Sequence, residues 1–437
     1  MRWIYDVGFG LFGLFSLPHF LLRLRQAEDP GRLVRERFGR FDPEAKARFQ
    51  KRHCVWLHAV SVGEALAAEK LVMRILENYP GLQIVLTTVT PTGQRVAKAW
   101  EGDRLGVFYF PFDFRFSVSR FFDTVRPVCL VLVETEIWPN VIEEARRRGV
   151  PMVVVNGRLS GRSFRAFQTF SSLFRPLLRA IDRFFVQTES DRERLVALGV
   201  DSPKVEVTGN MKLDALDLNG KETGNRDALR RQWGFLPGDQ VLVAGSTHRG
   251  EEEILLRAVS RLRTEGFALR LLLAPRHIER ASKLLALAQR AGFRGVLSSQ
   301  KRAGGPFDVL ILNELGQLRN LYALADAVVM GGSLVPHGGQ NPVEPAAAGR
   351  AILHGPWVFN FHDLYRRLDE NGGSLKVSGE GELLFALKRV LGSDREREHL
   401  GRRAFEVLSQ LRGATERNLI GIGPLLKTEN GVKSEFA

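Results

Sequence analysis

Residues 53–60 read HCVWLHAV, residues 61–78 read SVGEALAAEKLVMRILEN, and residues 83–90 read QIVLTTVT. The first and third segments are mostly apolar runs of strand length, and the second has apolar side chains at helical spacing. A strand, a helix and a second strand in this order predict a parallel sheet covered by helices on both faces. The pattern recurs along the chain, so it predicts the fold class of the whole protein.

The same alternation is repeated in two blocks. In the first block, apolar runs follow at 128–135, 151–158 and 183–190, and in the second at 241–248, 269–277, 308–312, 325–333 and 351–356. Between them, LNGKETGNRDALRRQWGFLPGDQ (218–240) is polar and contains glycines, which is typical of a connection. We predict two doubly wound α/β domains, which suits a chain of 437 residues.

These patterns give a predicted domain organisation. The parts are a membrane anchor at 1–25, an N-terminal Rossmann-like domain at 26–217, an interdomain linker at 218–240, a C-terminal Rossmann-like domain at 241–425 and a flexible tail at 426–437.

The charge balance favours an anionic partner. Lys plus Arg number 63 and Asp plus Glu 49, a formal charge of +14, which suits nucleic acid, acidic lipid or a phosphorylated substrate. Apolar residues at 44% and charged residues at 26% exclude a disordered or low-complexity chain. Two cysteines, Cys54 and Cys129, supply no disulfide framework and no four-thiolate metal site, and they favour a reducing compartment.

The N-terminus predicts membrane attachment. Residues 3–22, WIYDVGFGLFGLFSLPHFLL, approach the roughly 20 apolar residues that cross a bilayer, although Asp6 and Pro18 interrupt them. The Arg-rich segment that follows keeps the body of the protein on the cytoplasmic side. An N-terminal helix packed on the protein itself is the alternative, and spanning or lying in the interface are both left open.

Glu64 is the first residue with a chemical interpretation. It follows the small-residue turn Ser61–Gly63 and falls in the first turn of the predicted helix, where the helix dipole and free N–H groups stabilise a carboxylate. One interpretation is a helix cap, and the other is a general base at the mouth of a cleft. The dipole would lower the pKa of Glu64 and weaken the base unless burial raises it again.

A second feature is LAPRHIER (273–280). Arg276 directly follows a buried strand, and its guanidinium suits a phosphate. A pair between Arg276 and Glu279 is the alternative.

The strongest local pattern is MGGSLVPHGGQNPVEPAAAGRAILHGP (330–356). Its glycines allow the backbone to approach a ligand closely. Asn341 suits an N-cap and Pro342 a first helical residue, so the free amides of that helix start can bind a phosphate or sugar hydroxyls. Glu344 would lie in the first turn, where it could accept hydrogen bonds from a ribose diol.

Residues 157–183 form a basic and aromatic segment. Its phenylalanines recur at near-helical spacing (Phe164, Phe167, Phe170 and Phe174) among several arginines. Such a surface suits an anionic membrane or an acidic glycolipid. The alternative is that the phenylalanines face the core and the arginines face solvent. Elsewhere in the chain the nine histidines lack metal-site spacing, and no P-loop or GxSxG motif is present.

Together the motifs resemble the Kdo transferases, which add 3-deoxy-D-manno-octulosonic acid (Kdo) to the lipid A precursor. The matching segments are RERFG (35–39), WLHAVSVGE (56–64), TTVTPTG (87–93), FPFD (110–113), VETEIWPN (133–140), VNGRLS (155–160), GNMKLD (209–214), AGSTHRGEEE (244–253), APRH (274–277) and GGSLVPHGGQNPVEPAA (331–347). They follow the order of the family over nearly the whole chain, up to about residue 365.

The resemblance implies a GT-B fold, in which two Rossmann-like domains face a central cleft. It implies an inverting glycosyltransferase whose N-terminal domain binds the acceptor and whose C-terminal domain binds the donor, CMP-Kdo. In the family the Glu of the SVGE motif is the catalytic base, which here is Glu64.

The family's donor contacts are carried over to matching positions. They are Pro275, Arg276, Leu315, Gly316, Gln317, Asn341, Pro342, Val343 and Glu344. Many relatives carry Glu where this chain has Gln317, and a frequent His where it has Gln340. We further expect Lys212, Gly332 and Ser333 to contact the donor or the acceptor, and Lys212 could hold the donor carboxylate or an acceptor phosphate.

The resemblance also sets the expected surroundings. We expect CMP-Kdo and the lipid A precursor (lipid IVA) as substrates, no cofactor, no metal, no nucleic acid, and attachment to the anionic inner-membrane surface with the catalytic domains on the cytoplasmic side. The alternatives are a GT-B transferase or epimerase that uses another nucleotide sugar, or a membrane-surface or nucleic-acid-binding protein without catalysis.

Overall fold

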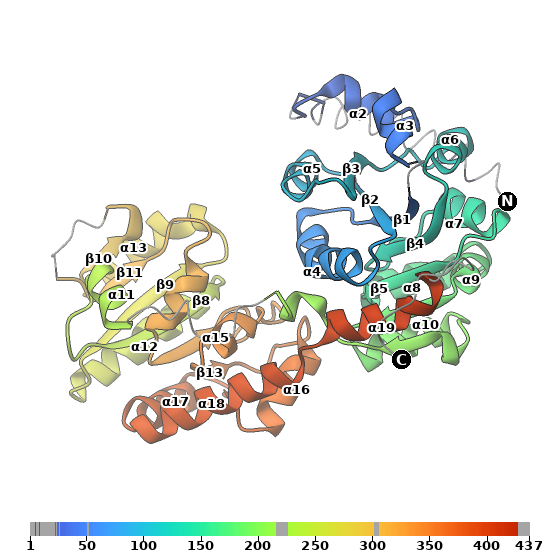
Figure 1. Ribbon diagram of the computed structural model, residues 1–437. Helices are drawn as coiled ribbons and strands as arrows, with labels where there is room; N and C mark the ends of the chain where they lie inside the picture. The colour runs from blue at the N-terminus through green and yellow to red at the C-terminus, as the bar shows by residue number, and fades with distance from the viewer. Residues whose placement is uncertain are drawn as a thin grey trace. The chain divides into compact units, whose positions relative to one another are not determined.

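The computed structural model describes two compact units. It describes Tyr5, Gly8, Leu22, Leu24 and Arg25, and residues 27–49, 52–215, 226–300 and 306–426. One unit consists of Met1–Ala215 with Arg412–Ala437, and the other of Leu216–Leu411. Each unit is an α/β domain in Figure 1, so the prediction of two parallel-sheet α/β domains is confirmed.

The first unit is built on a parallel sheet of seven strands within the described residues. The strands are β1 (His53–His58), β2 (Leu82–Thr88), β3 (Leu105–Tyr109), β4 (Pro127–Val133), β5 (Met152–Gly157), β6 (Arg183–Val186) and β7 (Val205–Val207). Their order is β3-β2-β1-β4-β5-β6-β7, and every neighbouring pair is parallel. The central strands are buried on both faces, which is why their sequences are continuous apolar runs.

Helices cover both faces of this sheet. They are α2 (Pro30–Arg37), α3 (Pro43–Phe49), α4 (Val62–Asn78), α5 (Pro91–Lys98), α6 (Arg115–Val125), α7 (Pro139–Arg147), α8 (Gly161–Thr169), α9 (Ser171–Ala180), α10 (Glu189–Ala197) and α19 (Ala414–Leu426). Residues of α3, α6, α7, α9 and α10 share one core with the sheet, and residues of α4, α5 and α19 share the other. The sheet is therefore doubly wound.

Helix α19 corrects the predicted domain boundaries. The prediction assigned residues 241–425 to the second domain, but α19, coloured red in Figure 1, packs on the first unit. Its residues Leu419, Ile422 and Leu426 are buried there, so Leu426 is not part of a flexible tail. Residues 427–437, the rest of the predicted tail, lie outside the described residues. Helix α19 follows the second unit in the sequence, but burying its apolar side chains on the first unit stabilises the position that it takes.

The second unit repeats the architecture. Its strands are β8 (Gln240–Thr247), β9 (Leu269–Pro275), β10 (Gly295–Leu297), β11 (Val309–Ile311), β12 (Ala327–Met330), β13 (Ala351–His354) and β14 (Ser374–Lys376). They form a parallel sheet in the order β10-β11-β9-β8-β12-β13-β14. The main helices are α11 (Arg226–Gln232), α12 (Glu251–Thr264), α13 (Ala281–Arg290), α14 (Leu318–Leu321), α15 (Val343–Ala347), α16 (His362–Glu370), α17 (Glu380–Leu391) and α18 (Asp394–Gln410).

Part of the predicted linker is also ordered structure. Residues 226–232 form α11, where Arg226 and Arg230 both pair with Asp326 at 2.8 and 2.6 Å. These ion pairs fasten α11 to the start of β12, a contact between residues about a hundred positions apart. The remaining linker residues up to 225 lie outside the described residues.

The predicted membrane anchor at 1–25 lies almost entirely outside the described residues. Among the residues that the structure does describe, none of the helices combines the length and the apolar character that crossing a bilayer requires.

Each sheet has one point where its strand order reverses. In the first unit this point lies between β1 and β4, and in the second between β8 and β12. Loops that leave the two strands on either side of such a point diverge, so the carboxyl ends of these strands form a crevice where ligands bind. The site residues below are located from these two points.

Candidate functional site

Glu64 lies at the reversal point of the first sheet. It is in the first turn of α4, which follows β1, and its side chain is only 8% exposed. The Val60 N–H donates to one carboxylate oxygen at 2.7 Å, and the Ser61 hydroxyl donates to the other at 2.8 Å. Burial raises the pKa of Glu64 above its ordinary value, although these two hydrogen bonds oppose the rise. Ser61 is the N-cap of α4, and Glu64 combines hydrogen bonds back to this capping turn with a raised basicity.

Two further carboxylates, those of Glu134 and Glu136, lie near Glu64. Glu134 and Glu136 follow β4, the strand on the other side of the reversal point. Burial, together with the charges of Glu64 and Glu134, raises the pKa of Glu136 to about 7. The motif VETEIWPN therefore brings acid–base groups to Glu64. Sequence reasoning assigned them no role, although two Glu residues directly after a buried strand were a usable signal.

Lys212 supplies the positive charge of this cluster. Its ammonium donates to Glu134 at 2.8 Å, and its charge lowers the pKa of Glu64. Lys212 is carried by a 3-10 helix, η2 (Met211–Leu213), and Asn156 of β5 accepts the Met211 N–H at 2.9 Å. The contact of Lys212 with a substrate anion stays a prediction, and the structure places Lys212 in the same cluster as Glu64.

Three non-glycine residues near the carboxyl ends of strands have strained backbone conformations. Glu134 (φ 61°), Asn156 (φ 53°) and Ser246 (φ 56°) have left-handed backbone conformations at or near the carboxyl ends of β4, β5 and β8. Such conformations cost about 1–3 kcal/mol for a non-glycine residue and concentrate at functional sites. Glu134 directly follows β4 and Ser246 lies on β8, strands that flank the two reversal points, and Asn156 lies on β5, one strand farther from the first of them.

Arg276 lies at the carboxyl end of β9 in the second unit. Its backbone N–H donates to the Thr247 carbonyl at 3.0 Å, so it stands beside the end of β8. Its side chain is exposed, and within the described part of the chain no hydrogen bond or ion pair involves its guanidinium, including one to Glu279. The alternative of a structural Arg276–Glu279 pair is therefore not observed. Pro275 is the last residue of β9 and is buried.

Gly332 and Ser333 serve the fold of the glycine-rich loop. Their backbone N–H groups both donate to Glu251 of α12, at 2.7 and 3.0 Å. The Ser333 hydroxyl is fully buried and donates to the Met330 carbonyl. The N–H groups of Gly332 and Ser333 and the Ser333 hydroxyl are therefore already bonded within the protein, so in this structure they are not available for the predicted contact with the donor. Gly331 is needed for close approach, because a Cβ there would lie 2.2 Å from the Ser246 carbonyl oxygen.

The Asn-Pro-x-Glu segment differs from its prediction by one position. Helix α15 begins at Val343 with Pro342 as its N-cap, and Asn341 accepts the Val343 N–H at 3.2 Å. Glu344 does lie in the first turn, where burial raises its pKa and the charge of Arg319 opposes the rise.

Arg319 also locates the third predicted donor segment. It belongs to α14, which directly follows Leu315, Gly316 and Gln317, so this segment lies near Glu344. Gly316 has φ 80°, and the Leu315 side chain is 79% exposed. Gln317 is exposed and makes no side-chain cap bond to α14.

The structure also brings together three histidines that sequence reasoning treated as scattered. The ring of His248 stacks on that of His337 with centroids 4.2 Å apart, and the ring of His277 lies edge-on to His248 at 6.1 Å. They follow β8, β12 and β9, so only the sheet order makes them neighbours. No group of three or more possible metal ligands occurs among the described residues.

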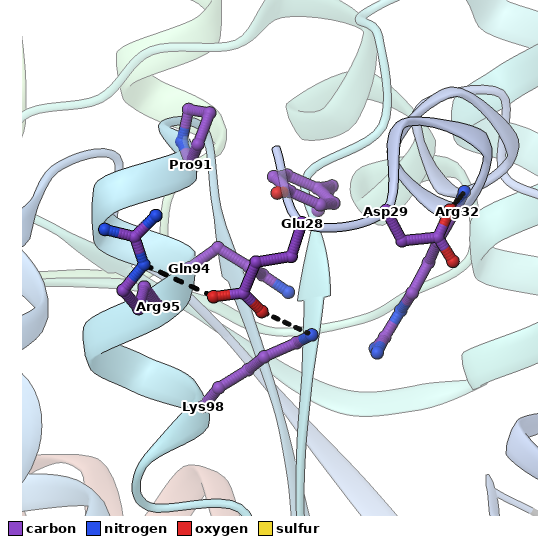
Figure 2. Close-up of a pocket in the computed structure, with 8 residues that line it drawn as sticks. Glu28, Asp29, Arg32, Pro91, Gln94, Arg95 and Lys98 are labelled. Carbon is purple, nitrogen blue, oxygen red and sulfur yellow. Dashed lines mark hydrogen bonds and ion pairs between the residues drawn. The ribbon is translucent and has the colours of Figure 1, made fainter. Parts of the chain in front are cut away.

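None of the site residues named above lines the cavity in Figure 2. It lies between α2 and α5, measures about 10 Å³, and is lined by charged residues. The Glu28 carboxylate pairs there with Arg95 at 3.3 Å and with Lys98 at 3.8 Å, as the dashed lines show. A space of this size holds at most about one water molecule.

The basic segment 157–183 forms α8, α9 and the start of β6. Phe164 and Phe167 are half-buried and pack against the core, so the core interpretation holds for these two, and the ring of Phe174 stacks on that of Phe167 at 4.2 Å. Phe170 is 60% exposed among exposed arginines, and it keeps the membrane-surface interpretation open.

Comparison with known proteins identifies the family. The model of the 3-deoxy-D-manno-octulosonic-acid transferases (kdotransferases) matches residues 32–215. The 3-deoxy-D-manno-octulosonic acid transferase of Haemophilus influenzae is 36% identical over 375 residues, which cover 85% of this chain and 87% of that protein. The chain belongs to this family. The Bordetella pertussis transferase is 34% identical over 88% of this chain and 89% of its own length.

A solved structure shares the fold of the Kdo transferase chain. The UDP-GlcNAc 2-epimerase of Neisseria meningitidis, solved with UDP-GlcNAc, superposes with a TM-score of 0.60 at 12% identity, over 85% of this chain and all of that one. At this identity the likeness shows the fold alone. The family assignment, rather than the fold, separates the Kdo transferases from the epimerases.

Proposed function

We propose that this chain transfers Kdo from CMP-Kdo to a primary hydroxyl of the glucosamine disaccharide of lipid IVA, in the assembly of the lipopolysaccharide inner core. The observation that carries the proposal is Glu64. In a member of the Kdo transferase family, the Glu of the SVGE motif is buried, has a raised pKa and stands at the reversal point of the acceptor-domain sheet.

Glu64 acts as the general base. Each of its carboxylate oxygens already accepts one hydrogen bond, and each has a further lone pair for the acceptor hydroxyl. The proton moves from that hydroxyl to Glu64 as its oxygen forms a bond to the anomeric carbon of Kdo. The bond from this carbon to the phosphate oxygen breaks, and CMP leaves with the electron pair. Attack opposite the leaving group inverts the configuration.

Arg276 binds the phosphate of the donor. Its free guanidinium is the kind of group that gains strength as negative charge grows on the leaving phosphate, which lowers the barrier selectively. Pro275, Asn341, Pro342 and Val343 shape this site, and Glu344 accepts hydrogen bonds from the ribose. Leu315, Gly316 and Gln317 close it near Glu344.

Lys212 tunes the base and orients an anion. One N–H of its ammonium is used by Glu134, and two remain for the donor carboxylate or an acceptor phosphate. Glu134 in turn fixes the position of Lys212 beside Glu64.

The enzyme works at the inner membrane in this proposal. Residues 1–25 attach it, and Phe170 with the exposed arginines of α8 and α9 faces the anionic surface, with the catalytic domains on the cytoplasmic side. The proposal needs no cofactor and no metal, and it includes no nucleic-acid partner.

The decisive experiment is a mass-spectrometric transfer assay with the full chain, CMP-Kdo and tetraacylated lipid IVA, run with and without EDTA. Wild type and the control Glu77→Gln, an exposed position on the same helix, should add one or more Kdo-sized masses. Glu64→Gln should not, although it still binds CMP. Inhibition by UDP rather than CMP would favour another nucleotide sugar, and binding to anionic vesicles without transfer would favour a scaffold. Loss of activity with EDTA would refute the metal-free mechanism.

A further inference from the structure

His248 makes an informative contact with Gln340. The two Nε2 atoms, one of the imidazole ring and one of the side-chain amide, lie 3.1 Å apart. An amide NH₂ group donates hydrogen bonds and accepts none. With the amide nitrogen facing the ring, as in this arrangement, the ring Nε2 accepts the hydrogen bond and carries a lone pair rather than a proton. His248 is consequently neutral, with its single ring proton on Nδ1.

The surroundings favour the same state. Burial, together with His337, His277, Arg280 and Arg276, lowers the pKa of His248 to about 4. The groups that face His248 come from several elements: His277, Arg276 and Arg280 follow β9, His337 belongs to the glycine-rich loop, and Glu251 of α12 accepts the His248 backbone N–H at 2.8 Å. Glu251 is also bonded to the glycine-rich loop, and Arg280 pairs with Glu252. Because Glu251 and Glu252 already have partners, the other groups that face His248 are mainly positively charged. An anion is therefore favoured beside His248.

The ring is also held in one orientation. His337 stacks on it with an interplanar angle of 20°, and the backbone of Gln340 is held by its main-chain carbonyl, which accepts the Tyr365 hydroxyl at 2.7 Å. Within the described residues no group accepts a hydrogen bond from His248 Nδ1. A positioned and unused N–H therefore lies at the carboxyl end of β8.

His248 itself lies beside Arg276. Thr247, the last residue of β8, pairs in register with Pro275, the last residue of β9, and His248 and Arg276 directly follow the two strands. Thr247 and Arg276 are joined by a backbone hydrogen bond. A phosphate held by the guanidinium would thus have the imidazole as its neighbour.

We propose that His248 is a donor-binding residue that hydrogen-bonds the phosphate of CMP through Nδ1–H, and that Gln340 is a positioning residue that fixes this tautomer. The proposal rests on the proposed function and names a contact within its donor site. It also gives a role to Gln340, which stands where relatives frequently carry His.

The first test is ¹⁵N NMR of the full chain with labelled histidine imidazoles, at pH 7 without substrate. The His248 resonances are assigned by their loss in His248→Gln. We expect the neutral Nδ1–H form in wild type. Gln340→Leu should give a mixture of tautomers, Gln340→His should restore the single form, and Gln340→Glu should raise the pH at which His248 titrates. A charged His248 or an Nε2–H form in wild type would overturn the proposal.

The second test is calorimetric titration with CMP. His248→Gln should weaken CMP binding about 10- to 100-fold, the loss expected for a hydrogen bond to a charged group. The control is His399→Gln, an exposed position on α18 of the same unit, which should bind like wild type. Unchanged CMP affinity in a folded His248→Gln protein would refute the contact. Failure of wild type to bind CMP would refute the proposed function instead, and the NMR result would still decide the tautomer.

Discussion

The ammonium of Lys212 donates a hydrogen bond to the carboxylate of Glu134 at 2.8 Å, although the two residues are 78 positions apart. Glu134 is held in a left-handed conformation at the end of β4, and Lys212 is held by η2, which binds β5 through Asn156. The pair stands beside Glu64 and sets the charge around it. Glu64 is therefore not an isolated buried carboxylate, because it belongs to a cluster in which Lys212 supplies the positive charge.

The first prediction concerns the pH dependence of transfer. Lys212 lowers the pKa of Glu64, so Lys212→Met should raise that pKa further above its ordinary value. Because the base must be ionised, the acid limb of the kcat/KM profile should move to higher pH, by about one unit or less. Lys70→Met, an exposed position on α4, should leave the profile in place. A shift to lower pH would contradict the assigned electrostatics.

The second prediction concerns Arg276. Arg276→Ala should weaken CMP binding about 10- to 100-fold, because the phosphate loses a charged partner. Its stability should change little, since the exposed guanidinium has no partner among the described residues. Calorimetric titration and a thermal melt measure the two quantities. Lys283→Ala, an exposed cation on the neighbouring α13, is the control, and equal CMP affinity in both variants would exclude Arg276 from the donor site.

The third prediction concerns the attachment of α19. Asp214 accepts the Gly413 N–H at 2.7 Å and the Thr415 N–H at 2.6 Å, so one carboxylate caps the start of this helix. Asp214→Ala should lower the free energy of unfolding by about 1–3 kcal/mol, because these donors lose their acceptor. Urea unfolding measures the change. Asp201→Ala removes an exposed aspartate that makes no cap bond and should cost far less. Equal losses in the two variants would contradict this role.

The fourth prediction concerns stability in acid. Burial lowers the pKa of His58 from 6.5 to about 3. Between these values the unfolded chain binds a proton that the folded chain does not. The stabilisation is thus complete above pH 6.5, and it is lost as the pH falls toward 3, by about 1.4 kcal/mol per pH unit for one proton. His248 contributes in the same direction down to about pH 4.

The measurement is the urea midpoint between pH 6.5 and 5, above the ordinary pKa of carboxylates. His58→Gln should reduce the slope of stability against pH, whereas His362→Gln, at a side chain that is 67% exposed, should not. A wild-type slope that persists in His58→Gln would show that His58 is not neutral in the folded state.

The sequence predicted the fold class because the strands are buried on both faces. Runs such as VCLVLV before an amphipathic helix have few other stable arrangements, and their alternation gave two doubly wound units. The strand-end positions of Glu64 and Arg276 were predictable for a related reason, because residues that directly follow a strand of a parallel sheet lie at the ligand-binding edge. Local sequence left their roles open, and the roles of base and phosphate ligand were taken from the family resemblance.

Some boundaries depended on contacts that local sequence does not encode. Helix α19 continues the chain from the second unit, yet its apolar face is buried on the first. The linker segment that became α11 owes its place to Arg226 and Arg230, whose partner Asp326 lies about a hundred positions away. Gly332 and Ser333 have the sequence of a ligand loop, but their N–H groups are used by Glu251.

The sequence by itself determined the alternation of strands and helices, the residues at each strand end, and the family through an ordered series of motifs. Only the tertiary structure decided which strand ends are neighbours. The sheet orders placed Glu134, Glu136 and Lys212 around Glu64, and His248 beside Gln340, His277 and His337. The reason is physical: burial and the field of nearby charges set the protonation of these groups, and both arise from residues distant in the chain.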